Sequence, residues 1–524
     1  MQTRVAKLLL QFGVAAVMIA ALPYKIFELD RYFVPKELVL HVVAIVFALI
    51  LLLPRRTIKV DIVDALLAFF LVWSAASAVF ATNHWLAQRA LGVSVSSVLV
   101  FWGARRIAGA GAHKELLVAA AFATVVAALT SLVQAYGLDS DYFSHNRAPG
   151  GTFGNRNFVA HIAAIGLPAL IWCTVTAKRP IGALVGSLGA AAVGATLVLS
   201  RSRAAWLAVV VSSIVLVIPL LLSRKYWDRR VVGGRFARVV LAMFIAGAVA
   251  TVLPNNLNWN SESPYLDSAK GMVNYKEGSG RGRLAQYQNS LEMAKANPVF
   301  GVGPGNWPVK YTRFAPGGDP SIADDGMTAN PWPSSDWVAF VSERGFVAAL
   351  ALALAFAVLF FTALTSWRHI ATGEGVLLRV VMAATIVATT VVSAFDAVLL
   401  LAAPALIVWT ILGASVGARQ KGREITLSPR AWKVAAIGIL VIVLASEIRS
   451  ATQTMAMSSV GQGGKTAGWV RGAKFDPGSY RINLKVAQLY ARRGKCSVAR
   501  PYAQRASQLF PSAPAAKRVA RQCR

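Results

Sequence analysis

The chain has 524 residues, of which 56% are hydrophobic and 15% charged, and its net charge is +31 with a mean hydropathy of +0.54. This composition excludes a soluble globular protein of this length. The basic residues are spread over short segments beside apolar stretches, where membrane topology and anionic lipids account for them, so nucleic acid is not expected as a partner.

Apolar stretches long enough to cross a bilayer recur along the sequence. The first stretch lacks a signal-peptidase site, so we interpret it as a membrane span. The sequence therefore predicts an all-α, polytopic helical membrane protein with about 12–14 transmembrane helices. The predicted spans are residues 6–22, 38–53, 62–82, 90–103, 115–137, 157–176, 181–199, 204–222, 237–254, 337–364, 376–393, 397–417 and 431–447.

Basic residues are concentrated in alternate loops, beginning with the loop that follows the second span. Because cytoplasmic loops carry the excess of Lys and Arg, this pattern predicts a cytoplasmic N-terminus. It places the large loop of residues 255–336 on the periplasmic side of a bacterial inner membrane. The parity of the spans also places the C-terminal tail in the periplasm.

Two parts of the chain are expected: a transmembrane domain (1–447) that includes the periplasmic loop 255–336, and a periplasmic tail (448–524). Residues 474–511 of the tail predict two amphipathic helices around Gly494, with the spacing of a tetratricopeptide-type hairpin. A hairpin of this size is too short to form a free-standing repeat array. The tail is therefore expected to pack on the membrane domain or on a partner. Asp476 is the only acidic residue in 465–524, and the positive charge is expected to favour acidic glycans or anionic headgroups.

The three cysteines fall in two different environments. Cys173 lies in an apolar span and is expected to be a small core residue. Cys496 and Cys523 lie in the tail, where an oxidising periplasm favours a disulfide over the alternative of two unrelated thiols.

Two polar motifs begin or end apolar stretches on the outer side. In HNRAPGGTFGNRNFVAHIA, starting at His145, Asn155 and Asn157 stand where a helix begins, so they either cap it or help to bind an anion. In LSRSRAAW, starting at Leu199, Arg201 and Arg203 stand between two spans. They either extend toward water or pair with an anion.

The periplasmic loop carries the most patterned stretch, GRGRLAQYQNSLEMAKANPVFGVGPGNW. Arg281 and Arg283 precede a helix predicted over residues 284–296, which ends at Asn297 and Pro298. The glycine turn that follows can direct successive backbone amides inward to hold an oxyanion. Its expected substrate-binding residues are Gly301, Gly303, Gly305 and Asn306.

A last motif, SSDWVAFVSERG from Ser334, leads into the tenth span. Asp336 stands at the membrane boundary, where it either caps the helix or takes part in catalysis. His161, one turn inside the sixth span, also suggests a functional role because intramembrane histidines are costly.

The sequence lacks a metal-binding cluster of Cys and His, a Walker loop and a dinucleotide motif, so no metal or cofactor is expected. Arginine chemistry at an outer membrane surface without ATP suggests a substrate that arrives already activated. A sugar on a lipid diphosphate fits, because its leaving group needs charge stabilisation, which the guanidinium fork supplies.

In these motifs the chain resembles the O-antigen ligase and O-antigen polymerase (Wzy-like) superfamily of bacterial inner-membrane glycan transferases. The resemblance rests on GTFGNRNFVA, SRAAWLA, RLAQYQNSLEMAKANPVFGVGPGNW and SDWVAFVSERG, in this order, and covers about residues 60–417. It implies a fold like that of the C-type glycosyltransferases, an undecaprenyl-diphosphate-linked glycan as donor and metal-independent transfer.

The resemblance implies that Arg203 and Arg283 bind the diphosphate. With Asp336 they form the predicted catalytic set. Ligases of this superfamily usually have His-Asn where this chain has Ser334 and Ser335, so the usual candidate for activating the acceptor is missing. Asp336, His161 or His145 would have to replace it, unless the acceptor needs no base. The predicted substrate-binding residues are Arg201, Arg281, Asn155, Asn157, Ser334, Ser335 and the four residues of the glycine turn.

The predicted function is transfer of this glycan onto a growing polysaccharide, a lipid or a protein, as a polymerase or ligase. The other expected partners are membrane lipids and, through the tail, other polysaccharide-assembly proteins. Two alternatives remain open: a membrane transporter of a small anion, and a non-catalytic scaffold of a polysaccharide-assembly complex.

Overall fold

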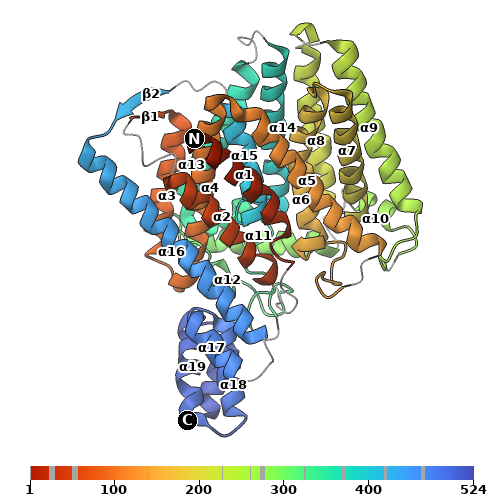
Figure 1. The fold of residues 1–524 in the computed structure, drawn as a ribbon. Helices are drawn as coiled ribbons and strands as arrows, with labels where there is room; N and C mark the ends of the chain where they lie inside the picture. Colours follow the sequence, from red (N-terminus) through yellow and green to blue (C-terminus); the bar gives the residue numbers. More distant parts are fainter. Residues whose placement is uncertain are drawn as a thin grey trace.

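The computed structural model describes the chain as an almost wholly helical protein (Figure 1), which confirms the predicted all-α class. The described residues are 2–22, 30–49, 57–137, 140–222, 224–226, 228–259, 261–271, 278–323, 326–366, 372–417, 422–461 and 466–523.

Every predicted span overlaps a helix, and residues 50–53 of the second span lie outside the described residues. By length and composition, seven helical stretches within the described residues are apolar enough to cross a membrane, and α3, α8 and α15 are shorter apolar helices. These findings confirm a polytopic membrane protein. The helices that overlap the predicted spans are α1 (Gln2–Ile19), α2 (Val34–Phe47), α3 (Ile62–Ala78), α4 (His84–Ile107), α5 (His113–Tyr136), α6 (Arg156–Val175), α7 (Pro180–Ser200), α8 (Arg203–Leu222), α9 (Arg229–Val252), α13 (Asp336–Ser366), α14 (Gly373–Phe395), α15 (Ala402–Gly417) and α16 (Pro429–Gly461).

Helix α4 begins six residues before the span predicted at 90–103. Its start is fixed by Asn83, whose side chain accepts hydrogen bonds from the backbone amides of Trp85 and Leu86. Arg89 in its second turn lowered the apparent hydropathy, but this side chain pairs with Glu37 of α2 at 2.8–3.0 Å. Hydropathy alone cannot detect a charge that is neutralised by a neighbouring helix.

The structure also contains two strands that the sequence did not predict. Strand β1 (Thr57–Val60) pairs antiparallel with β2 (Arg423–Thr426), with Thr57 opposite Thr426. Both strands belong to loops predicted on the cytoplasmic side, and Figure 1 shows them far from the C-terminal tail. Strand pairing across more than 350 residues leaves no local pattern to recognise.

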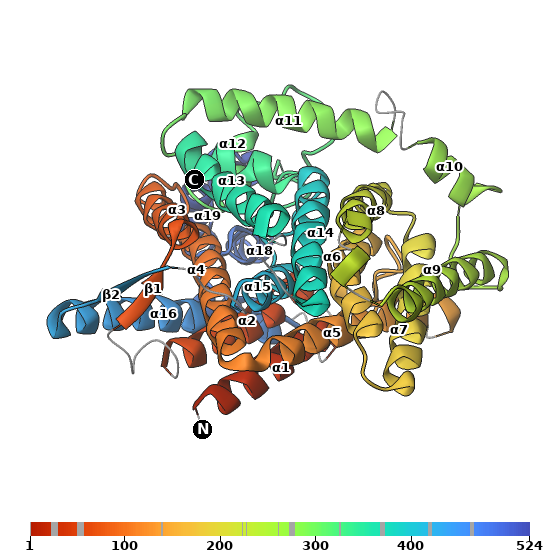
Figure 2. The same ribbon diagram turned by 90° about the horizontal axis from the view of Figure 1, so that it is seen from above.

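The large loop forms three helices at the same end of the molecule as the tail (Figures 1 and 2). They are α10 (Pro264–Lys270), α11 (Gly278–Ala296) and α12 (Trp307–Tyr311). Helix α11 ends at the predicted residue but begins six residues earlier than predicted. Figure 2 shows α11 lying across one side of the bundle, beside α13.

The tail consists of four helices that pack on the large loop. Tyr480, Leu484 and Phe510 of the tail belong to one buried apolar cluster with Val309 and Met327 of the loop. This packing confirms the expectation that the tail docks on the membrane domain. The helices are α17 (Thr466–Phe475), α18 (Tyr480–Ala491), α19 (Cys496–Leu509) and α20 (Pro514–Gln522), and the predicted pair around Gly494 is α18 and α19.

Helix α16 runs unbroken across the domain boundary predicted at residue 447 and fixes the tail through buried charges. Arg449 of α16 pairs with Asp476 at 3.2 Å, and its guanidinium lies 4.8 Å from the centre of the Trp85 ring. Burial raises the pKa of the Asp476 carboxyl, and the Arg449 charge opposes that rise. The only acid of the tail is therefore used internally.

Candidate functional site

The hinge between α7 and α8 directs two arginines toward the large loop. Arg201 ends α7 in the left-handed conformation, with φ of 54°. Its Nε donates a hydrogen bond to Ser268 Oγ at 2.8 Å, and its guanidinium lies 4.5 Å from the centre of the Trp259 ring. Arg203, the first residue of α8, donates to the carbonyl of Gly271. Both side chains therefore bind residues of the large loop.

A third arginine joins this group from α6, and the sequence did not single it out. The guanidinium of Arg156 lies 5.0 Å from the same Trp259 ring that Arg201 contacts. Arg147 and Arg201 are close enough to repel Arg156 electrostatically. Burial lowers the pKa of Arg201, whereas the nearby Tyr265 and Asp267 favour its cationic form. Two guanidinium groups against one tryptophan, with Arg147 near Arg156, favour a bound anion, because an anion relieves their mutual repulsion. The only sequence signal for Arg156 was its place between two asparagines of the GNRN segment.

Arg283 of α11 lies near His161 of α6. Both Arg283 and Asp396 are close enough to His161 to act on it electrostatically. Among the described residues, neither a hydrogen bond nor an ion pair engages Arg283, which is partly buried. His161 is 1% exposed, and neither of its ring nitrogens has a hydrogen-bond partner in the part of the chain that the structure describes.

An unpartnered imidazole at this depth is unusual, because buried polar atoms are normally hydrogen-bonded. Phe158 contacts the ring edge-on, with centroids 6.5 Å apart. Arg156 and His161 are five residues apart, so they lie within about 8 Å of each other along the axis of α6. Arg156, which contacts Trp259, therefore stands about one and a half turns of α6 before His161, the residue that Arg283 approaches.

The amides of the glycine turn bind groups of the protein itself. The Glu343 carboxyl of α13 accepts hydrogen bonds from the backbone amides of Gly305 at 2.8 Å and Trp307 at 3.2 Å. The amide of Gly303 donates to the Glu343 carbonyl at 2.8 Å, and the amide of Gly301 to that of Asn297 at 2.9 Å. These donors are engaged in the structure, and substrate binding by the turn stays a prediction.

Asn306 and the glycines have a packing role instead. The Asn306 side chain exchanges hydrogen bonds with the backbone of Asn83 at 2.7 and 3.0 Å, which joins the turn to the start of α4. Gly301 has φ of 64°, and a Cβ there would come within 2.3 Å of the Glu343 backbone. The glycines thus allow the turn to lie directly on α13.

Asp336, the first residue of α13, binds the turn that precedes α15. Its carboxyl is fully buried and accepts hydrogen bonds from the amides of residues 398–400, at 2.7–3.3 Å. It therefore satisfies backbone donors of a distant segment and does not cap the helix that it begins, which was one of the two expected roles. A catalytic role for Asp336 stays a prediction.

The remaining predicted residues bind other parts of the protein or are exposed. Ser334 donates its amide to Gln286, and the buried Ser335 donates its hydroxyl to the Ser393 carbonyl at 3.1 Å. Asn155 caps α6 by accepting the amide of Asn157 at 3.0 Å, which fits the capping alternative. Arg281 is exposed.

Residues 188–353 match the family model described as O-antigen ligase. The match runs from within α7 to within α13, so it includes Arg201, Arg203, Arg283 and the glycine turn with Glu343. No curated protein matches the chain.

Proposed function

The chain belongs to the O-antigen ligase and Wzy-like superfamily of membrane proteins, and from this premise we propose that it transfers an undecaprenyl-diphosphate-linked glycan to an acceptor at the periplasmic face of a bacterial inner membrane. The acceptor is a growing polysaccharide, a lipid or a protein, so the enzyme is a polymerase or a ligase. The transfer requires no metal and no cofactor.

One observation carries the proposal: Arg283 has no protein partner among the described residues and lies beside a buried histidine that also has none. Unpaired guanidinium groups are costly near a membrane unless an anion meets them. A diphosphate bound between Arg283 and the arginines around Trp259 would be held by charge-assisted hydrogen bonds from both sides. This arrangement supports a donor whose leaving group is a diphosphate.

In the proposed reaction, the acceptor hydroxyl oxygen forms a bond to the anomeric carbon of the donor sugar. The bond between that carbon and the diphosphate oxygen breaks, and undecaprenyl diphosphate leaves with the electron pair. Negative charge grows on the leaving diphosphate in the transition state. Arg203 and Arg283 stabilise that charge, which lowers the barrier.

The proton of the acceptor hydroxyl requires a base, and Ser334 and Ser335 cannot supply one. His161 is the residue best suited to receive it, because both ring nitrogens are unengaged in the part of the chain described. Since His161 is buried, the acceptor reaches it only when neighbouring side chains, Phe158 among them, move aside. Asp336 has no catalytic part in this scheme.

The test is transfer by purified full-length protein from a polyprenyl-diphosphate-linked oligosaccharide, with the length of the product measured on gels. Arg283→Ala should reduce the rate about 10²–10³-fold, the usual effect of removing one transition-state donor. Arg281→Ala is the matched control, because it removes the same charge from an exposed position on the same helix. It should change the rate by less than about tenfold.

Full transfer by Arg283→Ala would refute the assigned role of this residue. Absence of transfer by the wild-type protein, with anion uptake into vesicles instead, would support a transporter. Normal polymer in cells that carry both Arg203→Ala and Arg283→Ala would support the scaffold alternative.

A further inference from the structure

The end of the tail farthest from the membrane helices carries a dense group of exposed cations. We define this cationic tip by the exposed basic residues within five positions of either tail cysteine: Arg492, Arg493, Lys495, Arg500, Arg518 and Arg521. The chain terminus marks this end in Figure 1, below the outer loops and away from the membrane helices.

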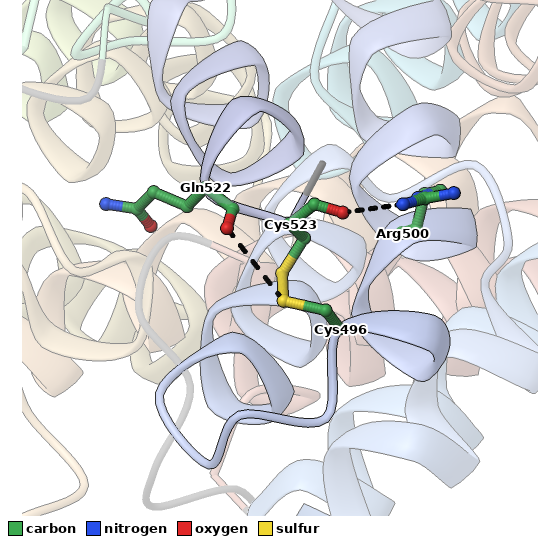
Figure 3. Close-up of a disulfide and its surroundings, with 4 residues drawn as sticks. All are labelled: Cys496, Arg500, Gln522 and Cys523. Carbon is green, nitrogen blue, oxygen red and sulfur yellow. Dashed lines mark hydrogen bonds between the residues drawn. A yellow bond between two sulfur atoms is a disulfide. The ribbon is translucent and has the colours of Figure 1, made fainter.

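A disulfide brings the two halves of the cationic tip together. Cys496 at the start of α19 is bonded to Cys523 just after α20, with their Cα atoms 4.9 Å apart (Figure 3), which confirms the predicted bridge. Arg500 donates a hydrogen bond to the Cys523 carbonyl at 2.8 Å. The turn between α18 and α19 and the end of α20 therefore form one surface, although 27 residues separate the two cysteines.

Within the described part of the tail, no exposed acidic side chain neutralises this surface. Asp476 is the only acidic residue between 465 and 524, and its carboxylate is buried against Arg449 at 3.2 Å. Like charges held close together destabilise one another unless a counter-ion is bound. A fixed group of cations without acidic neighbours is thus suited to a polyanion.

The position of the cationic tip favours a soluble polyanion over the lipid in which the protein is embedded. The tail docks on the large loop through its other end, with Leu509 and Phe510 packed near Val309. Ser512 also accepts a hydrogen bond from Thr312 of the loop at 2.7 Å. Surface potentials decay within about 10 Å at 0.1 M salt, so distant headgroups contribute little.

We propose that the cationic tip binds the acidic polysaccharide on which the enzyme acts, so that the glycan substrate class is a chain bearing carboxylate groups. This inference rests on the proposed function and narrows it. Carboxylates repeated along a chain can each meet a guanidinium fork, and several weak contacts on one chain add up to a firm hold. The tail would then keep the growing chain close to the membrane site between transfers.

The test measures binding of full-length protein in nanodiscs of neutral lipid to oligogalacturonate, with dextran of equal length as the uncharged probe. Wild type should bind oligogalacturonate at least about tenfold more tightly than dextran, and added salt should weaken the binding. Replacing Arg492, Arg493, Lys495, Arg518 and Arg521 by Gln should weaken it about tenfold or more. Arg500 is left intact because it holds the disulfide end of the tail.

Two control variants separate the cationic tip from general charge. One replaces five exposed cations elsewhere on the tail by Gln, namely Arg471, Lys474, Arg481, Lys485 and Arg505, and should weaken binding much less. The other replaces Arg492, Arg493, Arg518 and Arg521 by Lys, and should bind less tightly than wild type but more tightly than the Gln variant, because it keeps the charge and loses the guanidinium forks. Equal binding of both glycans, or wild-type binding by the tip variant, would overturn the proposal.

Binding of the tip to phosphatidylglycerol vesicles without binding to oligogalacturonate would also overturn it and would identify a membrane ligand. The experiment separates this proposal from the proposed function, because Arg283→Ala should abolish transfer and leave oligogalacturonate binding unchanged. Normal transfer by Arg283→Ala would instead count against the proposed function and leave the binding result standing.

Discussion

Two regions of the large loop, the glycine turn and the start of α11, look equally suited to phosphate in the sequence, but the structure shows a difference between them. At the glycine turn, Glu343 occupies the amides of Gly305 and Trp307, so the binding capacity is used within the protein. At the start of α11, Arg283 and the neighbouring His161 remain without hydrogen-bond partners among the described residues. A polar motif therefore indicates a substrate site only where its donors and acceptors are left unused.

The largest expected effect concerns the glycine turn, whose amides Glu343 binds. Glu343→Ala leaves two buried amides without an acceptor, and each costs about 1–3 kcal/mol, so the free energy of unfolding should fall by about 3 kcal/mol. Thermal unfolding in detergent measures this loss. Transfer per folded molecule should stay within about tenfold of wild type. Loss of transfer without loss of stability would place the glycine turn in the substrate site, and the turn would then no longer differ from the start of α11.

The next effect concerns His161, the unpartnered neighbour of Arg283. His161→Gln should reduce transfer about 10²-fold, the lower end of the usual contribution of a general base. Stability should change little, because the ring makes no hydrogen bond that the substitution would break. The pH profile of the rate separates catalysis from packing: the wild-type profile should lose its ascending limb in the variant. An unchanged profile with an unchanged rate would show that the acceptor needs no base here.

Arg283→Lys tests whether the charge of Arg283 alone, or the planar shape of its guanidinium group, supports transfer. Lysine keeps the charge but cannot offer two parallel N–H groups to a phosphate, so the rate should fall about tenfold. The matched measurement is Arg203→Lys under the same conditions. A lysine at position 283 that restores full activity would mean that Arg283 acts only as a point charge.

The smallest effect on transfer is expected at Asp336. Asp336→Asn retains an oxygen that can accept the amides of Val398 and Leu399, but its NH2 group would face the amide of Leu400. Transfer per folded molecule should remain within about threefold, and the free energy of unfolding should fall by about 1–3 kcal/mol. Assays of the initial rate and of the unfolding midpoint check this outcome. A 10²-fold loss of transfer at unchanged stability would restore Asp336 as a catalytic residue.

Much of the fold could be predicted because it depends on local properties. A span must be helical, since lipid offers no partner for backbone amides, so apolar length alone located α1–α9 and α13–α16. The spacing around Gly494 likewise predicted α18 and α19, and the oxidising compartment favoured the disulfide between Cys496 and Cys523.

The candidate site could be predicted only in part. The motifs proposed Arg203 and Arg283 for the diphosphate, and the structure places Arg203 against the Gly271 carbonyl and Arg283 near His161. They also proposed the glycine turn and Asp336, whose hydrogen bonds go to other parts of the protein, and they did not single out Arg156. Glu343 lies 36–38 residues from the turn amides that it binds, and Asp336 lies 62–64 residues from the amides before α15 that it binds. Local sequence patterns do not reveal partners at such separations.

The sequence by itself determined the class of the protein, the order of its apolar helices and the types of residue available for anion binding, because each follows from side-chain chemistry and local spacing. Only the tertiary structure decided which of those groups remain unused, because hydrogen bonding and ion pairing are set by residues distant in the chain. Glu343 filling the glycine turn and Asp476 buried against Arg449 are both of this kind.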